Sequence, residues 1–205
     1  MDADTFLEDI RAAHRTELSR LSSSKAVYAL TRGEMDGDAV RRGIARELHA
    51  LAPVLDGWAD DADGDVADLF AEATDFAANA AESFDSGAAA GGDSVTHVTA
   101  DALGAVEPAD RPAAMAAAFL VLEELAGQLV GFFVGDADRK SADEFRAFRG
   151  ELGEFRDAAA DLLADRADDG DWEDAHEVGT GVVEGAYDWY VGTLESMGVE
   201  PKNVC

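Results

Sequence analysis

The chain contains a single cysteine, Cys205, which is the last of its 205 residues. One cysteine cannot form an internal disulfide, and it excludes a zinc or iron–sulfur site built from several cysteines. A prenylation signal is not expected either, because that signal needs three residues after the cysteine. The thiol is expected to be incidental, although a redox or dimer-linking role stays open.

Lysine is almost as scarce, and only three lysines occur in the chain. A surface that follows nucleic-acid phosphates needs clustered lysine and arginine, so we expect no direct nucleic-acid binding. The densest group of cations is Arg41, Arg42 and Arg46. We expect these three side chains to balance neighbouring acids.

Signals for export and for membrane insertion are also lacking. The first ten residues carry charges where a signal peptide needs an apolar core, so we expect a cytoplasmic protein. The most apolar stretch, Ala113–Val134, has Glu123 and Glu124 at its centre. Each central acid would cost a membrane helix about 2.5–3.5 kcal/mol. The stretch is therefore predicted to be a buried core helix, and no membrane span is expected.

Acidic residues, in contrast, are abundant: 44 Asp and Glu face 16 Lys and Arg, for a formal net charge of −28. A compact chain of this charge repels itself unless salt screens the repulsion. The acids are spread from Asp2 to Glu200 instead of forming one acidic tail. This pattern is typical of a halophile. We expect hydrated cations at the surface and a fold that depends on salt.

Hydrophobic spacing predicts an all-α fold, because apolar residues recur with helical period and no stretch alternates long enough for a strand. We expect a single all-helical domain over residues 1–205, formed as a bundle of about six helices. The predicted helices span roughly residues 4–31, 38–59, 66–84, 112–135, 141–167 and 172–197.

Local signals mark several boundaries of these helices. Thr5 and Ser141, each followed three residues later by Glu, have the spacing of a capping box at a helix start. Pro53 predicts a kink or break in the second helix. Residues 86–111 are predicted to be irregular, with a short helix at 100–106, and such a long loop is either a crossover connection or a functional segment.

Glycines recur every four residues in the fourth helix, at Gly127, Gly131 and Gly135. Either they form a helix-pairing motif or they make room for large neighbouring side chains. Both interpretations predict that another part of the protein packs tightly against this stripe.

Two familiar binding loops are rejected on the residues that they would need. Residues 87–94 have the spacing of a phosphate-binding loop, but Asp93 stands where the lysine is required. The acidic turns around Gly64 and Gly170 lack the terminal glutamate of a calcium loop. We interpret both turns as solvated helix breaks.

The four histidines were considered as metal ligands or bases: His14, His49, His97 and His176. His14 and Glu17 lie three residues apart on the first predicted helix, and Glu173-x-x-His176 is the one Glu-x-x-His at helical spacing. An acid is expected in that first turn for the helix dipole alone. Glu123 and Glu124 are further candidates, because one of them has to face the core unless both reach solvent or pair with an arginine.

Four stretches of the chain resemble a haloarchaeal group related to the rubrerythrin branch of the ferritin-like superfamily. They are Leu18–Lys25, Asp56–Asp60, Leu129–Gly135 and Leu194–Pro201. The resemblance implies an up-down bundle with a crossover connection and, in active members, two irons held by helical Glu and Glu-x-x-His ligands.

That ligand pattern is largely degenerate here. Glu17 corresponds to the first-helix glutamate, but Glu47 is followed by Ala50 and Glu72 by Asp75 where histidines are expected. Only Glu173 and His176 match by spacing. We therefore assign no catalytic, cofactor-binding or metal-binding residues from the sequence.

The leading hypothesis is a non-catalytic helical bundle that acts through association with itself or with another protein. The Gly-striped fourth helix and the aromatic-rich last helix are its candidate surfaces. The alternative is a rubrerythrin-like di-iron or other metal-dependent oxidoreductase that uses some of Glu17, Glu47, Glu72, Glu173 and His176. A helical maturation chaperone, which the long loop would permit, is the second alternative.

Overall fold

The computed structural model describes residues 1–84, 96–168 and 170–201. Every regular element in these ranges is helical, which confirms the all-α fold. Five long helices form the body of the molecule: α4 (Gly37–Asp60), α5 (Asp65–Phe84), α7 (Arg111–Gly135), α8 (Arg139–Arg166) and α9 (Asp171–Ser196). Short helices complete it: α1 (Ala3–Ala13), α2 (Arg15–Leu21), α3 (Ser24–Leu30), α6 (Ala100–Leu103) and the 3-10 turn η1 (Pro108–Asp110).

Helix α7 occupies the centre of the fold, as its apolar sequence predicts. Its residues from Arg111 to Leu122 are all buried, and α8, α9 and the short helices pack around it. By length and composition, the segment Pro108–Gly135 is the one described helical stretch that could cross a membrane. A core helix meets the same criterion, and the arrangement is compatible with a soluble protein.

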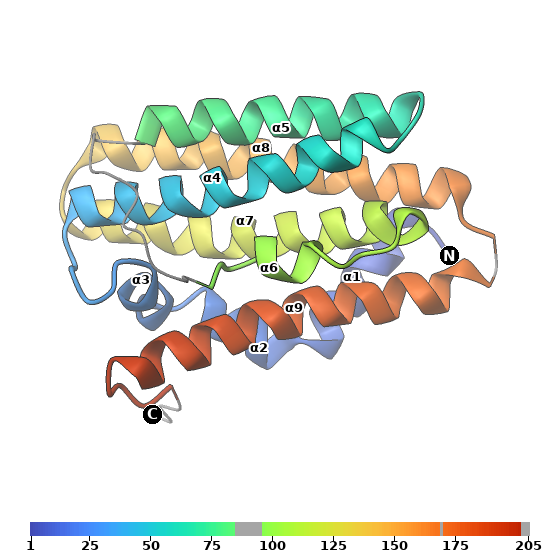
Figure 1. Cartoon of the computed structure of the whole chain (residues 1–205). Helices are drawn as coiled ribbons and strands as arrows, with labels where there is room; N and C mark the ends of the chain where they lie inside the picture. Colours follow the sequence, from blue (N-terminus) through green and yellow to red (C-terminus); the bar gives the residue numbers. More distant parts are fainter. Residues whose placement is uncertain (85–95, 169, 202–205) are drawn as a thin grey trace.

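The long helices form two antiparallel hairpins, α4–α5 and α7–α8 (Figure 1). Helices α5 and α7 run in the same direction, so the chain between them has to return along the length of the bundle. The described part of this connection contains α6 and η1. The predicted short helix thus exists but ends at Leu103, before Val106.

The first predicted helix, over residues 4–31, is wrong as a single element because the chain bends twice. His14 has φ −109° and ψ 30° between α1 and α2, and Ser22 and Ser23 separate α2 from α3. The Ser23 hydroxyl donates to the carbonyl of Arg20 at 2.6 Å. Serine side chains that bond to nearby backbone in this way compete with continued helix.

Both predicted capping boxes are also wrong in detail. Asp2 caps α1 by accepting from the Thr5 amide at 2.8 Å. Asp138 caps α8 and accepts from both the amide and the hydroxyl of Ser141. In each case an aspartate three residues upstream supplies the acceptor that a helix N-terminus requires.

Helix α4 continues through Pro53, so the predicted break is absent. The glycine stripe of α7 also differs from expectation. The guanidinium of Arg149 lies beside Gly127, but Gly131 and Gly135 are exposed, and a Cβ atom at either would meet nothing within 4 Å. The predicted tight packing against this stripe is therefore wrong within the described chain.

Candidate functional site

The candidate di-iron ligands do not come together. Glu72 on α5 and Glu173 on α9 are exposed, whereas Glu47 on α4 is buried. His176 lies 3.8 Å from Asp9 of α1 and packs edge-on against Phe6. Within the described ranges, no group of three or more His, Cys, Asp and Glu side chains is placed to hold a metal. These residues therefore do not fit the iron pair that the family resemblance implies.

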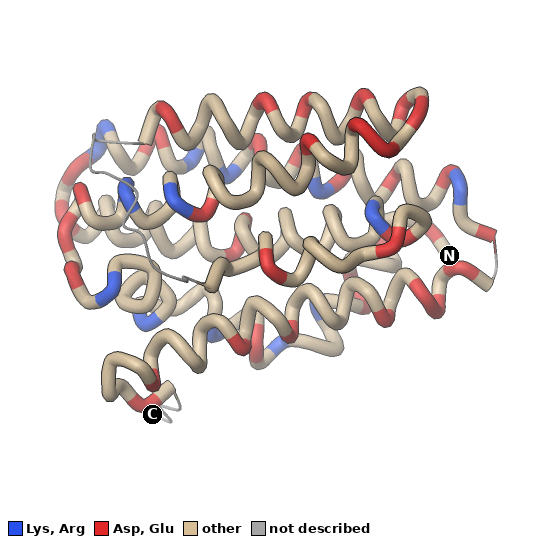
Figure 2. The backbone as a smooth tube through the Cα atoms, in the orientation of Figure 1, with Lys and Arg blue, Asp and Glu red and all other residues tan. Residues whose placement is uncertain are grey.

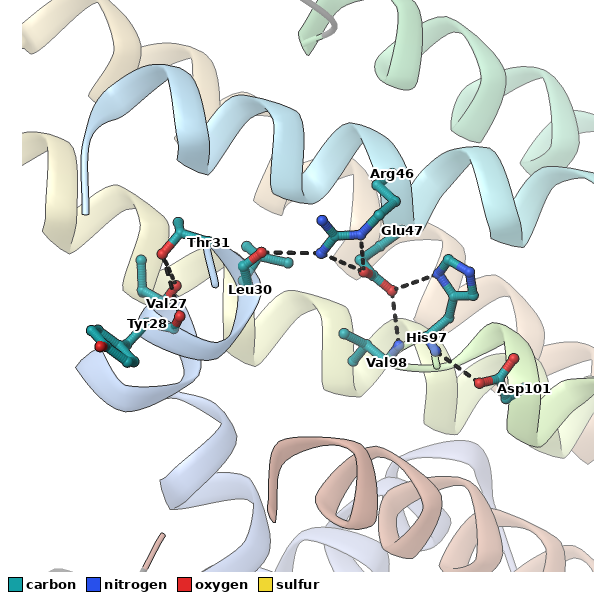
Figure 3. Close-up of polar contacts among 9 residues, drawn as sticks. All are labelled: Val27, Tyr28, Leu30, Thr31, Arg46, Glu47, His97, Val98 and Asp101. Atoms are coloured by element: carbon teal, nitrogen blue, oxygen red, sulfur yellow. Dashed lines mark hydrogen bonds and ion pairs between the residues drawn. The ribbon is translucent and has the colours of Figure 1, made fainter. Parts of the chain in front are cut away.

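The most enclosed charged side chain in the described ranges is that of Glu47, which is only 2% exposed. Figure 3 shows its carboxylate between two sets of donors from distant parts of the chain. Its Oε1 accepts from the guanidinium of Arg46, at 3.2 Å from Nε and 3.1 Å from Nη2. Its Oε2 accepts from the Val98 amide at 2.8 Å and lies 3.2 Å from Nδ1 of His97.

The partners of Glu47 join three segments of the fold. Arg46 also donates to the carbonyl of Leu30 at the end of α3, at 3.0 Å. His97 and Val98 belong to the connection that precedes α6, and the amide of His97 donates to Asp101 at 2.8 Å. The carboxylate thus fastens the connection to α4 and, through Arg46, to α3. We call Arg46, Glu47, His97, Val98 and Asp101 the Glu47 cluster.

The imidazole of His97 is the titratable partner in this cluster. Its hydrogen bond to Glu47 raises the pKa of His97 above the ordinary 6.5, against the opposing effect of partial burial. The charges that face it are Glu47 and Arg46 of α4 and Asp101 of α6. An imidazolium beside the carboxylate strengthens the contact by adding charge to the hydrogen bond.

All of the donors around Glu47 come from the protein itself, and the two oxygens accept four hydrogen-bonding contacts. A carboxylate satisfied in this way is poorly suited to bind a metal or to take a proton from a substrate. The geometry therefore indicates a structural role for Glu47, which holds the connection before α6 against α4.

A second acidic centre lies at Glu123, one of the two glutamates of the apolar helix, and it pairs with arginine, which is one of the alternatives left open by the sequence. Glu123 of α7 forms ion pairs with Arg156 and, at 3.5 Å, with Arg149, both from α8. Arg11 of α1 lies 3.9 Å away. The side chain of Glu123 is 15% exposed, so this centre is more accessible to solvent than the Glu47 cluster.

The remaining sequence candidates have ordinary structural partners. His14 is buried, with Nε2 3.0 Å from the Thr180 hydroxyl, and His49 is exposed. The three predicted arginines pair with acids as expected: Arg41 with Glu144, Arg42 with Glu34 and Arg46 with Glu47.

Sequence reasoning missed a buried cation at the start of α7. Arg111 donates to Asp61 at 3.1 Å and lies over the ring of Trp58, with its guanidinium carbon 5.5 Å from the ring centroid. Its Nε and Nη1 have no hydrogen-bond partner within the described chain. The position at a predicted helix start, after an acidic segment, gave no local sign of burial.

Part of the predicted irregular segment and the cysteine fall outside the described residues. The phosphate-loop spacing at 87–94 lies there, as does Cys205. The glycine-rich half of the loop that would permit a chaperone role also lies there, whereas residues 96–110 are described and contain α6 and η1.

Compared with models of known protein families, with curated proteins and with solved structures, the chain matches none of them.

Proposed function

We propose that this protein is a non-catalytic helical bundle that associates with a second copy of itself, in the cytoplasm of a halophile. The observation that carries the proposal is the outer face of α7 near its C-terminal end. Gly131 and Gly135 are exposed there, and Val134 is 54% exposed, the largest value among the large hydrophobic residues that the structure describes.

The charge distribution supports self-association at this face. No charged residue occurs from Leu125 to Gly135, whereas acids are spread over most of the other helices (Figure 2). Two copies of a chain with a net charge of −28 repel each other wherever carboxylates meet. An uncharged face is where two copies can approach at the lowest electrostatic cost.

The shape of α7 supports the same partner. A helix with exposed glycines lets another helix come closer than one covered with large side chains. Met35, which is 43% exposed, adds apolar surface at the same end of the bundle, because its neighbour Gly37 packs against Phe133. The hydrogen bonds of Glu47 are already taken up by protein donors, and the candidate di-iron ligands lie apart. Both observations favour this non-catalytic function over the oxidoreductase alternative.

Sedimentation equilibrium in molar KCl tests the proposal. We expect the wild-type chain to form a dimer and Gly131→Asp to be monomeric, because the new carboxylates would face each other across the interface. Gly181→Asp on α9 is the matched control, since Gly181 is also an exposed helical glycine with nothing within 4 Å of its Cβ position. A monomeric wild type, or equal dissociation of both variants, contradicts the proposal.

A further inference from the structure

A groove of about 650 Å³ opens where α2, the start of α3 and the end of α9 meet. Arginine, lysine and hydroxyl side chains surround its mouth, and Tyr190 and Pro201 close its inner side. The lining residues are Arg15, Thr16, Ser19, Arg20, Ser23, Ser24, Lys25, Tyr190 and Pro201. We call this the basic groove.

The charge of the basic groove is opposite to that of the whole protein. Arg15, Arg20 and Lys25 contribute three cations, and no carboxylate side chain lines the groove. Glu17 lies between Arg15 and Arg20 in the sequence but does not line the groove, so the charged side chains that line it are all cations.

These cations also differ from most arginines of the protein in their partners. Arg41, Arg42, Arg46, Arg111 and Arg156 each pair with at least one carboxylate. Within the described residues, Arg15, Arg20 and Lys25 form no ion pair.

Two neutral contacts hold two of the three cations of the basic groove, Arg20 and Lys25, in place. Arg20 donates to the Tyr187 hydroxyl at 2.7 Å, and Lys25 donates to the carbonyl of Glu200 at 2.7 Å. Guanidinium carries five N–H donors and ammonium three, so most of their hydrogen-bonding capacity is not used by these contacts. The groove therefore presents positioned donors to a ligand.

We propose that the basic groove binds an oxyanion group, either a phosphate or a carboxylate, of a small molecule. Arginine donates in a planar fork that suits both groups, and the hydroxyls of Thr16, Ser19 and Ser24 surround the same opening. A nucleic acid is disfavoured, because the cations end with the groove and do not continue as a track for successive phosphates. This inference does not rest on the proposed self-association.

Calorimetric titration in molar KCl, with inorganic phosphate in one arm and citrate in the other, tests the inference. We expect saturable binding in at least one arm, and the stronger arm identifies the class of oxyanion. The double variant Arg15→Gln/Lys25→Gln is expected to weaken binding on the order of tenfold for each cation removed, since hydrogen bonds to charged groups are the stronger ones.

The chain offers a closely matched control in Arg139→Gln/Lys140→Gln. Arg139, like Arg15, is the exposed first residue of its helix, and neither Arg139 nor Lys140 forms an ion pair within the described residues. The control variant has the same change in net charge and should bind as the wild type does. Absence of saturable binding in both arms, or equal weakening by both double variants, overturns the inference.

Discussion

Glu47 and Glu123 are both acids on inward-facing helix surfaces, but they are stabilised in different ways. Glu47 is 2% exposed, and a backbone amide, a histidine and the adjacent arginine hold it. Glu123 is 15% exposed, and it meets long arginine side chains, two of which are themselves substantially exposed. The first centre depends on a fixed hydrogen-bond geometry, and the second depends on ion pairs that lie closer to solvent. Removal of the Glu47 carboxylate and removal of the Glu123 carboxylate should therefore lower the stability of the fold by different amounts.

The largest effect is expected for Glu47→Leu. The substitution leaves the buried Val98 amide and the groups of Arg46 and His97 without their acceptor, and it releases the connection before α6 from α4. We expect the free energy of unfolding to fall by about 3 kcal/mol, because removing one partner of a buried polar cluster leaves the other uncompensated. Urea unfolding at constant molar KCl measures the loss.

A smaller effect is expected for Glu123→Leu under the same conditions. Arg11 and Arg149 can turn into solvent when their acceptor is removed, since their side chains are 38% and 48% exposed. We expect a loss of about 1 kcal/mol, typical of ion pairs near the surface. If Glu123→Leu costs as much as Glu47→Leu, the proposed difference between the two centres is wrong.

The smallest effect is a pH dependence that only the Glu47 cluster should show. The pKa of His97 is raised above 6.5 in the folded state by its bond to Glu47. Its contribution to stability is thus fully present below pH 6.5 and is lost as the pH rises through the folded-state pKa.

Urea unfolding at several pH values in molar KCl compares the wild type with His97→Gln. We expect this loss with rising pH to disappear in the variant. His49→Gln, at an exposed histidine, is the control and should retain the wild-type dependence. An unchanged pH profile in His97→Gln would remove the basis for this assignment.

The fold was predictable where one helix carries a continuous signal. The apolar run of α7 predicted its ends within one residue, because few charges interrupt it. The bends at His14 and at Ser22–Ser23 were not predictable in the same way, since no proline or glycine marks them. At Ser23, a local side-chain bond to the carbonyl of Arg20 competes with a helical period that continues through residues 4–31.

The candidate sites were less predictable, because their partners are far apart in the chain. Fifty residues separate Glu47 from His97, and no local pattern connects them. One signal was available: Glu47 lies three residues after Ile44 and four before Leu51, and so falls on the buried stripe of its helix. The basic groove had no comparable signal, since Tyr190 and Pro201 join α2 and α3 only through folding.

The packing of Trp58 has a practical consequence for following this protein in solution. The indole is 5% exposed and lies between the ring of Phe70, at a centroid distance of 5.3 Å, and the guanidinium of Arg111. The environment of Trp58 on α4 therefore depends on the packing of both α5 and α7 against α4. The fluorescence of this residue offers a native optical reporter for the separation of α5 or α7 from α4 during unfolding.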